Sequence, residues 1–541
     1  MERPNRDSCR AAERPGLGGP RHGVCPANRV TASNLRVRLG LLALGGILIA
    51  GSLLISRTGE SGRVAAPPSV PRGIVVICFD TLRADGMSLP GEPPGPMPRL
   101  QKFAEDATIF VDATASSAWT EPSVASLLTG LRPSRHGMLP QFRPCPLSSA
   151  VETLAARLHA GGWATGAITG GGWVSPDLGF GHGFDTFATH FEQVRPETAI
   201  ETWDRSRAKD RPFSLFLHTY AAHDPYGERG WFRGGSPRLH VAATLTPAEL
   251  TAGLERGGGR LPDDLVPLLG LQFLTDPQGR RLCRASLGNP RYDSLLTALM
   301  PWYDGGYAEA DGRAALETAL RASYRSGLSG ADEAIDDALA VMARKGLLEA
   351  TDVIITGDHG EAFGEHKALY HGLHLYDEVL RVPMVVRTHG RVRGPHLARG
   401  ACGLTDVAPT VLALAGLPPA PDLEGTSLLA LAERPEPGRT VVAEMERSRD
   451  LTQVAGGHMR LFAARSTQWK WILRYDPEDA TVLGEELYDL TKDPGETKPL
   501  PAGAQLPSAV GAEFRRVVET ERARVRRLAG APDAEAGYLV R

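Results

Sequence analysis

Apolar residues occur along the chain in two kinds of run, one of strand length and one with helical spacing. Ile74–Phe79 is continuously apolar, which is typical of a parallel strand covered on both faces. Three other segments have the same character: Phe213–Leu217, Asp352–Thr356 and Val382–Val386. Helical patterns lie between them, at Arg99–Asp106, Val151–Ala160 and Ala331–Leu348. Strands that alternate with helices predict an α/β domain with a central, mostly parallel sheet between helices.

Side chains that can bind metals or transfer protons follow three of these strands. Asp80 follows the first strand, His218 closes another with His223 just after it, and Asp358 and His359 follow a third. Ligands bind beyond the carboxyl ends of strands in such sheets, so we expect one shared site. Carboxylate and imidazole groups suit a divalent ion such as Zn²⁺, Mn²⁺, Mg²⁺ or Ca²⁺. Taken singly, each residue is better explained by a capped loop or a solvated charge, and it is their shared placement that favours a binding site.

Thr120 stands at the start of a predicted short helix. Pro122 lies in the first turn and Gly130 follows the last apolar residue, which marks the two helix ends. Free backbone N–H groups at a helix N-terminus favour an anion such as phosphate or sulfate. A bound metal ion can turn a neighbouring hydroxyl into a nucleophile. Thr120 is therefore a candidate nucleophile and metal ligand, and the alternative is that it only caps the helix.

The N-terminal region has the pattern of a signal anchor. Residues 1–38 are rich in Arg, and Leu39–Ile55 contains no charged residue. This pattern predicts a cytosolic tail over 1–38, a transmembrane helix over 39–56 and a linker over 57–72. We expect a single-pass protein of the cell membrane with an extracytoplasmic catalytic domain. The alternative is a cleaved signal peptide, because the small pair Ala65-Ala66 follows the apolar stretch.

Length and charge narrow the picture further. With 541 residues the chain exceeds what one hydrophobic core usually supports, which predicts a large domain with a smaller appendage. We expect the catalytic domain over 73–435, a small C-terminal α+β subdomain with an antiparallel sheet over 436–505, and a helical or loose tail over 506–541. The formal net charge of -3 argues against general binding of nucleic acid.

Seven segments, in the family's order, resemble the sulfatase-like branch of the alkaline phosphatase superfamily. They are Phe79–Asp85; Trp119–Gly130 with Pro133–Gly137; Gly179–Asp185; His218–Tyr226; Thr356–Glu361; Tyr376–Pro383; and Glu486–Pro494. Each segment alone is weak evidence, whereas seven in order over most of residues 73–500 are specific. Residues 228–320 match poorly and are predicted to form an insertion or a cap on the substrate side.

The resemblance implies roles for particular residues. Three of them fall on metal-ligand positions: Asp80, Asp358 and His359. Thr120 falls on the position of the nucleophile, and His223 matches a histidine that contacts the substrate or leaving group. His371 lies near the place of a basic active-site residue in many relatives. For His371 and His218 the alternative is a hydrogen-bonded histidine beside the site.

The chain also departs from the sulfatase pattern. Sulfatases carry Cys or Ser in a Cys/Ser-x-Pro-x-Arg motif that is oxidised to formylglycine, whereas this chain has Thr120, which cannot be converted, and Val124 in place of the Arg. Thr81 replaces the second Asp of the usual pair, and Thr169–Gly172 lacks the usual Lys. The chain is therefore more similar to threonine-nucleophile phosphodiesterases, phosphonate ester hydrolases, and phosphoglycerol and phosphoethanolamine transferases.

These observations lead to one principal hypothesis and two alternatives. The principal one is a metal-dependent hydrolase or transferase in which Thr120 attacks an anionic ester, foremost a phosphodiester or phosphonate. Water as acceptor gives hydrolysis, and a sugar or lipid hydroxyl gives transfer; the anchor is compatible with a lipid or cell-envelope glycan substrate. The alternatives are a sulfuric ester hydrolase without formylglycine and a non-catalytic, envelope-binding relative. The retained site residues argue against the non-catalytic relative.

Overall fold

The computed structural model describes residues 72–140, 145–191, 194–223, 274–275, 281–282, 310–390, 395–447, 458–501 and 506–530. All of them belong to the second of the two units into which the chain divides, Pro68–Arg541. The predicted tail and membrane anchor lie outside the described residues, and so does the predicted linker except for Arg72. Among the helices that are described, none is both long enough and apolar enough to span a membrane.

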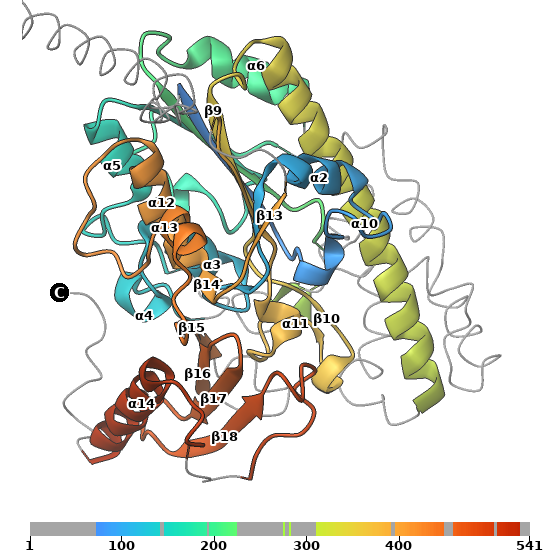
Figure 1. The fold of residues 1–541 in the computed structure, drawn as a ribbon, viewed down its shortest axis with the longest axis vertical. Coiled ribbons are helices and arrows are strands. Elements are labelled where there is room, and N and C mark those ends of the chain that lie inside the picture. Colours follow the sequence, from blue (N-terminus) through green and yellow to red (C-terminus); the bar gives the residue numbers. More distant parts are fainter. Residues whose placement is uncertain are drawn as a thin grey trace, which may run out of the picture. The chain divides into compact units, whose positions relative to one another are not determined.

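An eight-stranded sheet forms the centre of this unit (Figure 1). Its strands, in spatial order, are β13 (His396–Ala398), β2 (Thr108–Phe110), β12 (Met384–Arg387), β9 (Thr351–Gly357), β1 (Gly73–Phe79), β6 (Phe213–Thr219), β4 (Ala164–Ile168) and β5 (Thr186–Ala188). The five strands from β9 to β5 are parallel to one another. The predicted α/β fold with a mostly parallel central sheet is therefore confirmed.

The direction of β12 differs from the prediction. The sequence predicted a strand at Val382–Val386 of the same parallel kind as the others, but β12 runs antiparallel to both β9 and β2. The chain leaves β9 at its carboxyl end and stays at that edge through a loop and helix α11 (Asp377–Leu380). It then enters β12 from the same edge, and a return from the same edge needs no crossover and must be antiparallel.

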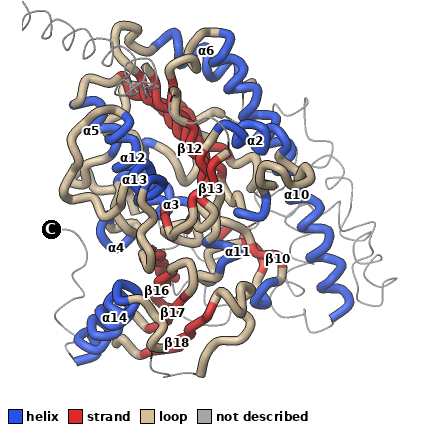
Figure 2. The backbone as a smooth tube through the Cα atoms, in the orientation of Figure 1, coloured by secondary structure: helices blue, strands red, loops and turns tan. Residues whose placement is uncertain are grey.

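Helices cover both faces of the sheet (Figure 2). One face carries α2 (Pro98–Phe103), α6 (Pro196–Ser206) and α10 (Ala310–Arg344); the other carries α3 (Thr120–Thr129), α5 (Leu154–Ala160), α12 (Val407–Leu414) and α13 (Leu428–Glu433). Alternate residues of β1 enter the two cores, Val75 and Ile77 on one side and Val76 and Cys78 on the other. Each fully buried aliphatic side chain contributes about 1.5–3 kcal/mol, which explains why this strand is apolar throughout.

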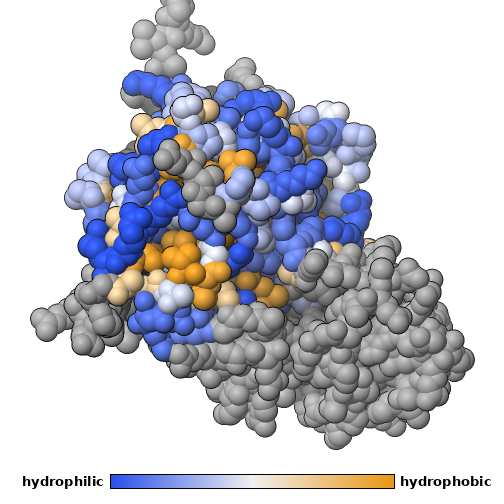
Figure 3. All heavy atoms as spheres, turned by 90° about the horizontal axis from the view of Figure 1, so that it is seen from below, coloured by the Kyte–Doolittle hydropathy of each residue, from blue (hydrophilic) through white to orange (hydrophobic). Residues whose placement is uncertain are grey.

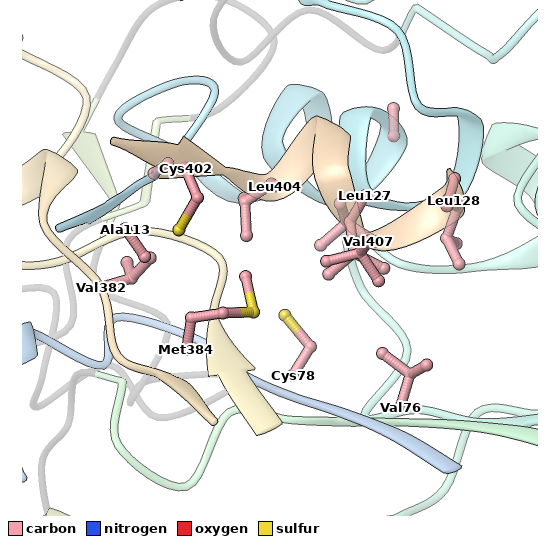
Figure 4. Close-up of a cluster of buried hydrophobic side chains, with 14 of the residues drawn as sticks. Val76, Cys78, Ala113, Leu127, Leu128, Val382, Met384, Cys402, Leu404 and Val407 are labelled. Carbon is pink, nitrogen blue, oxygen red and sulfur yellow. The ribbon is translucent and has the colours of Figure 1, made fainter. Parts of the chain in front are cut away.

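The core beneath α3 lies directly behind the candidate nucleophile. Val76, Cys78 and Met384 from the sheet face Leu127 and Leu128 from the helix (Figure 4). All five side chains are buried. The predicted short helix after Trp119 is confirmed, and Gly130 ends it in the left-handed conformation at φ 69°. Packing of this kind fixes the helix axis and, with it, the direction in which its N-terminus points.

The other predicted helices exist with shifted bounds. The first is α2 extended by a 3-10 turn to Asp106, and α5 begins at Leu154, where the Thr153 side chain accepts a hydrogen bond from the Ala156 N–H. Helix α10 begins at Ala310, inside the predicted insertion, and ends at Arg344. Apart from this start, the described residues of the insertion are the two short strands β7 (Leu274–Thr275) and β8 (Arg281–Leu282).

The C-terminal part forms the small antiparallel sheet that the sequence predicted. Its strands are β15 (Val441–Arg447), β16 (Met459–Arg465), β17 (Trp469–Tyr475) and β18 (Val482–Asp489), each paired with the next. Helix α14 (Ala512–Gly530) packs Phe514 and Val518 against Trp471. Large apolar side chains are exposed at few described positions, Val482 and Leu483 among them. On the face that Figure 3 shows, the described surface is largely hydrophilic, with one larger group of apolar residues and a few smaller ones.

Candidate active site

The register of the central strands brings the predicted site residues together. Phe79 of β1 lies opposite Gly357 of β9, so Asp80 and Asp358 leave neighbouring strands side by side. On the other side of β1, Cys78 lies opposite His218 of β6. The carboxyl ends of three adjacent parallel strands therefore supply one cluster, at the edge where ligands bind in such sheets.

Thr120 and the three predicted metal ligands form a compact, buried group. The Thr120 hydroxyl donates a hydrogen bond to Asp80 Oδ2 at 3.1 Å and lies 3.4 Å from His359 Nε2. The same Nε2 atom lies 3.4 Å from Asp80 Oδ1 and 3.6 Å from Asp358 Oδ2. All four residues are at most 2% exposed. One ligand atom from each of Asp80, Asp358 and His359 lies within 4.8 Å of the others.

The hydrogen bonds of this group fit a bound cation. Asp80 Oδ1 and Asp358 Oδ2 are buried and have no hydrogen-bond partner among the described residues. Asp358 Oδ1, in contrast, accepts from the backbone N–H groups of Thr81 and His359. A buried polar atom without a partner costs about 1–3 kcal/mol, and more when charged. Two such carboxylate oxygens and one imidazole nitrogen form a group that could hold a divalent cation.

The protonation states are consistent with metal ligation. His359 Nδ1 lies 2.8 Å from the Gly360 carbonyl oxygen, which can only accept, so Nδ1 carries the proton and Nε2 presents its lone pair. Burial lowers the pKa of His359 well below its usual value. Burial, together with the Asp358 charge, raises the pKa of Asp80, and burial raises that of Asp358 to about 7. Two carboxylates held so close without a cation repel each other.

Thr120 is the first residue of α3, and its hydroxyl does not cap the helix. The N-cap residue is Trp119, which makes no side-chain capping hydrogen bond. The Thr120 hydroxyl is instead turned to Asp80. The Trp119 ring packs edge-on against Trp173 at 5.7 Å between centroids, which fixes the turn before the helix. The first N–H groups of α3 have no intrahelical partner, and so a negatively charged group is favoured there.

Three further histidines surround the group. His371 donates from Nδ1 to Glu361 Oε1 at 2.9 Å, and its ring lies 4.6 Å from that of His359 and 5.0 Å from that of His223. Burial lowers the pKa of His371, but Glu361 outweighs this effect and the pKa is raised to about 9. His218 Nε2 lies 4.0 Å from Asp358 Oδ2. The structure thus places all six predicted site residues and His218 at one end of the sheet.

The residues at the positions that depart from the sulfatase pattern make packing or hydrogen-bond contacts in the structure. Val124 is fully buried in the core beneath α3. Gly172 has φ 60°, and a Cβ atom there would approach the Tyr220 hydroxyl to 3.2 Å. Thr81 also has a positive φ of 56°, and its hydroxyl donates to the Ala222 carbonyl at 2.9 Å. None of these side chains supplies a positive charge to the site.

Two residues that support the site carried no sequence signal for this role. Tyr324 of α10 donates from its hydroxyl to the Thr81 carbonyl at 2.8 Å, although 243 residues separate them. Tyr220 donates to the Gly171 carbonyl at 2.8 Å, and its ring lies 4.8 Å from that of His218. A tyrosine that acts through tertiary contacts has no local motif, and only a search for buried hydroxyls near the site could have found them.

Glu365 and His366, which lie a few residues after Asp358 and His359 in the sequence, order the loop after β9. Glu365 forms ion pairs with Arg83 at 2.9 Å and with Arg321 at 2.7 Å. His366 Nδ1 lies 2.8 Å from Glu378 Oε1, and its Nε2 lies 2.9 Å from the Glu496 carbonyl oxygen. These contacts attach the loop after β9 to α10 and to the C-terminal part of the chain.

Several known proteins resemble this chain in sequence or in fold. Arylsulfatase K of Bos taurus is 29% identical over 179 residues, which are 33% of this chain and 32% of that protein. The chain thus matches about a third of the length of the curated relative. A solved structure of a protein in complex with its substrate, D-glucosamine-2-N,6-O-disulfate, has a TM-score of 0.59 at 18% identity. The match covers 86% of this chain and 100% of that protein's chain.

The phosphonate monoester hydrolase of Agrobacterium radiobacter has a TM-score of 0.55 at 19% identity, over 85% of this chain and 96% of its own. These two structures share the fold. Residues 364–522 match the C-terminal family model of N-sulphoglucosamine sulphohydrolase. Residues 72–417 match the sulfatase family model. The resemblance found in the sequence is therefore confirmed, and the chain belongs to the sulfatase family.

Proposed function

We propose that this protein is a metal-dependent hydrolase of anionic esters, foremost phosphodiesters and phosphonate esters, with Thr120 as the nucleophile. One observation carries the proposal. The Thr120 hydroxyl, at the N-terminus of α3, donates to Asp80 Oδ2 at 3.1 Å within the buried group of Asp80, Asp358 and His359. The Thr120 hydroxyl has no structural role as a helix cap, because the N-cap residue of α3 is Trp119.

Asp80, Asp358, His359 and the Thr120 oxygen would hold the divalent ion. When bound, the ion supplies positive charge that favours the ionised hydroxyl and balances negative charge on the ester. Asp80 Oδ2, which already accepts the Thr120 hydrogen bond, is placed to receive its proton as the oxygen attacks phosphorus. The first N–H groups of α3 hold the ester oxygens beside the hydroxyl.

Histidines complete the proposed reaction. His223 protonates the leaving oxygen, so that the bond to phosphorus breaks and an alcohol departs. His371, held by Glu361, supplies a positive charge near the developing negative charge. The Thr120 oxygen then carries the phosphorus group with its remaining substituent, which is the second ester group of a diester or the carbon substituent of a phosphonate. Attack of water releases the product acid, whereas attack of a sugar or lipid hydroxyl would give transfer.

Phosphorus esters are favoured over sulfate esters by the nucleophile and its surroundings. Thr120 cannot be oxidised to formylglycine, and Val124 stands where sulfatases carry an Arg. Sulfuric ester hydrolysis is the second candidate, and it is favoured by the arylsulfatase and sulfated-sugar relatives. The buried, unpaired carboxylate oxygens argue against a purely binding protein, since a protein that needs no metal would have no reason to retain them.

We further propose that the substrate is carried by a lipid or a cell-envelope glycan and that the chain is anchored in the cell membrane through residues 39–56. The neutral, apolar stretch after an Arg-rich segment supports the anchor. Extraction of membranes with carbonate, followed by protease treatment of intact cells, tests it. An anchored, extracytoplasmic domain stays in the membrane pellet and is cleaved from outside.

Turnover of four nitrophenyl esters tests the proposed activity: the phosphate, the bis-phosphate, a phosphonate and the sulfate. Each is assayed with Zn²⁺, Mn²⁺, Mg²⁺ or Ca²⁺, with Thr120→Ala beside the wild type. Thr129→Ala serves as the matched control, because it removes a buried hydroxyl at the other end of the same helix. We expect diester or phosphonate turnover that Thr120→Ala alone abolishes. Sulfate turnover that survives Thr120→Ala would favour the second candidate.

A further inference from the structure

Thr81 is a buried residue in a strained backbone conformation next to the candidate metal ligands. Its φ is 56°, a region that β-branched residues rarely adopt, and its side chain is fully buried. Strain of this kind persists only where the surrounding contacts enforce it, and it gathers at functional sites. The contacts that enforce it here show what the residue does.

Each polar group of Thr81 bonds to a different part of the site. The backbone N–H donates to Asp358 Oδ1 at 3.1 Å, and the backbone carbonyl accepts from the Tyr324 hydroxyl at 2.8 Å. The side-chain hydroxyl donates to the Ala222 carbonyl at 2.9 Å, across 141 residues of sequence. The strained residue therefore joins a candidate metal ligand, helix α10 and the turn that follows β6.

That turn carries His223. The His223 N–H donates to the Tyr220 carbonyl at 2.9 Å and closes the turn, in which Ala222 is the residue just before the histidine. The His223 ring packs edge-on against Tyr220 at 5.9 Å and against His371 at 5.0 Å between centroids. A hydrogen bond to the Ala222 carbonyl therefore acts one residue away from His223, the proposed donor of a proton to the leaving group.

We propose that Thr81 is a positioning residue whose hydroxyl fixes the Tyr220–His223 turn, and thereby the imidazole of His223, relative to the metal ligands. The hydroxyl proton is engaged with the Ala222 carbonyl, so the side chain is tied to the turn that carries His223. At the position where sulfatases carry the second aspartate, this chain thus has a threonine that links two loops, and we call this link the clamp. The effect on catalysis rests on the proposed role of His223, whereas the effect on the turn does not.

Three substitutions separate the hydroxyl from the strain. Thr81→Ser keeps the hydroxyl, Thr81→Val keeps the shape without it, and Thr81→Gly relieves the positive φ but also lacks the hydroxyl. Thr410→Val is the control, because Thr410 is fully buried and donates to the Asp406 carbonyl, and neither residue takes part in the contacts of Thr81. If Thr81→Val fails to fold, Thr81→Gly still reports on the hydroxyl.

The first readout is turnover of one diester series with leaving groups from nitrophenol to unactivated alcohols. General acid catalysis contributes about 10²–10⁴-fold and matters most for poor leaving groups. We expect Thr81→Val and Thr81→Gly to lose little kcat with nitrophenol and up to about 100-fold with alcohols. Thr81→Ser and Thr410→Val should keep the wild-type dependence. An equal loss for all leaving groups, or full activity in Thr81→Gly, overturns the proposal.

The second readout is hydrogen–deuterium exchange of the peptide that contains the turn, with and without Mn²⁺. Thr81→Val and Thr81→Gly should raise exchange there, while Thr81→Ser and Thr410→Val should not. This result does not depend on turnover. If the wild type cleaves no ester but the turn is loosened as expected, the proposed function fails and the clamp stands; unchanged exchange in Thr81→Gly refutes the clamp itself.

Discussion

His371 donates a hydrogen bond from Nδ1 to Glu361 Oε1 at 2.9 Å, and Glu361 is fully buried. The carboxylate accepts from one ring nitrogen and so fixes the orientation of the imidazole, with the other nitrogen free to face the ring of His359 or His223. Glu361 follows the metal motif by only two residues. One short loop thus provides two candidate metal ligands, Asp358 and His359, and also the carboxylate that supports the protonated His371.

Glu361→Gln is expected to lower kcat/KM by about 10–100-fold, the usual cost of removing a carboxylate that orients a site histidine. The amide keeps the size of the side chain but removes the charge that favours the protonated His371. Steady-state kinetics with a phosphodiester measure the effect. Glu446→Gln, which removes a carboxylate from an ion pair with Arg460 in the C-terminal sheet, is the control. Equal losses in both variants would contradict a role at the site.

Asp358 should lower the thermal stability of the metal-free protein and be required for its stabilisation by a metal ion. In the presence of a chelator, Asp358→Asn is expected to raise Tm, because one of two buried carboxylates is neutralised while the amide oxygen can still accept from Thr81 and His359. Addition of Mn²⁺ or Zn²⁺ should raise Tm of the wild type and leave the variant unchanged. Differential scanning fluorimetry measures both. A variant that is stabilised by metal as strongly as the wild type would rule out Asp358 as a ligand.

His136 should make the protein sensitive to acid. It is buried between the Ser126 hydroxyl at 3.0 Å and the Met138 N–H at 3.2 Å, and burial lowers its pKa to about 3. The folded state thus binds this proton more weakly than the unfolded state does, with a pKa of about 6.5 in unfolded chains. Its contribution to stability is therefore complete above about pH 6.5 and falls as the pH is lowered toward 3.

Urea unfolding of His136→Asn between neutral and acidic pH checks this prediction. The asparagine can accept from the Met138 N–H without titrating, so the free energy of unfolding should fall less steeply with acid than in the wild type. His374 contributes in the same direction, because burial lowers its pKa to about 4. The slope should therefore be reduced rather than removed. An unchanged slope would show that His136 is not protonated on unfolding.

Lys470 should be essential for stability. Its ammonium group is fully buried and pairs with Asp377 at 2.8 Å and Glu496 at 2.7 Å, which links α11 to the C-terminal sheet. Lys470→Met leaves both carboxylates without this partner and is expected to cost about 3–5 kcal/mol of the free energy of unfolding. Denaturant titration measures it. The double variant Lys470→Met/Glu496→Gln should recover part of the loss, and no recovery would argue against a charge effect.

The sequence was sufficient for the parts of the fold that local pattern encodes. The apolar run of β1 and the residues after β1, β6 and β9 predicted a covered parallel sheet with one site at its carboxyl edge. The direction of β12 was not predictable from its own residues, because an apolar strand looks the same in either direction. Only the return of the chain at the same edge, after α11, decides it.

The support of the site depends on tertiary contacts that no local pattern reveals. Thr81 was visible as a departure from the family pattern, but its positive φ and its bonds to Ala222 and Tyr324 arise from segments far apart in sequence. The candidate ligands could be proposed because each one follows a strand. Their common geometry, with two unpaired carboxylate oxygens facing His359 Nε2, required the register of the sheet.

Mass spectrometry of the acid-quenched reaction tests the central claim most directly. The protein is mixed with a phosphodiester or phosphonate ester and Mn²⁺, quenched within one turnover and digested with a protease. We predict a phosphoryl or phosphonyl adduct at the Thr120 oxygen, on the peptide that contains this residue. Thr120→Ala should form no adduct, and Thr120→Ser should carry none once its reaction has been chased to completion. Turnover in the wild type without any adduct, and undiminished in Thr120→Ala, would contradict nucleophilic attack by Thr120.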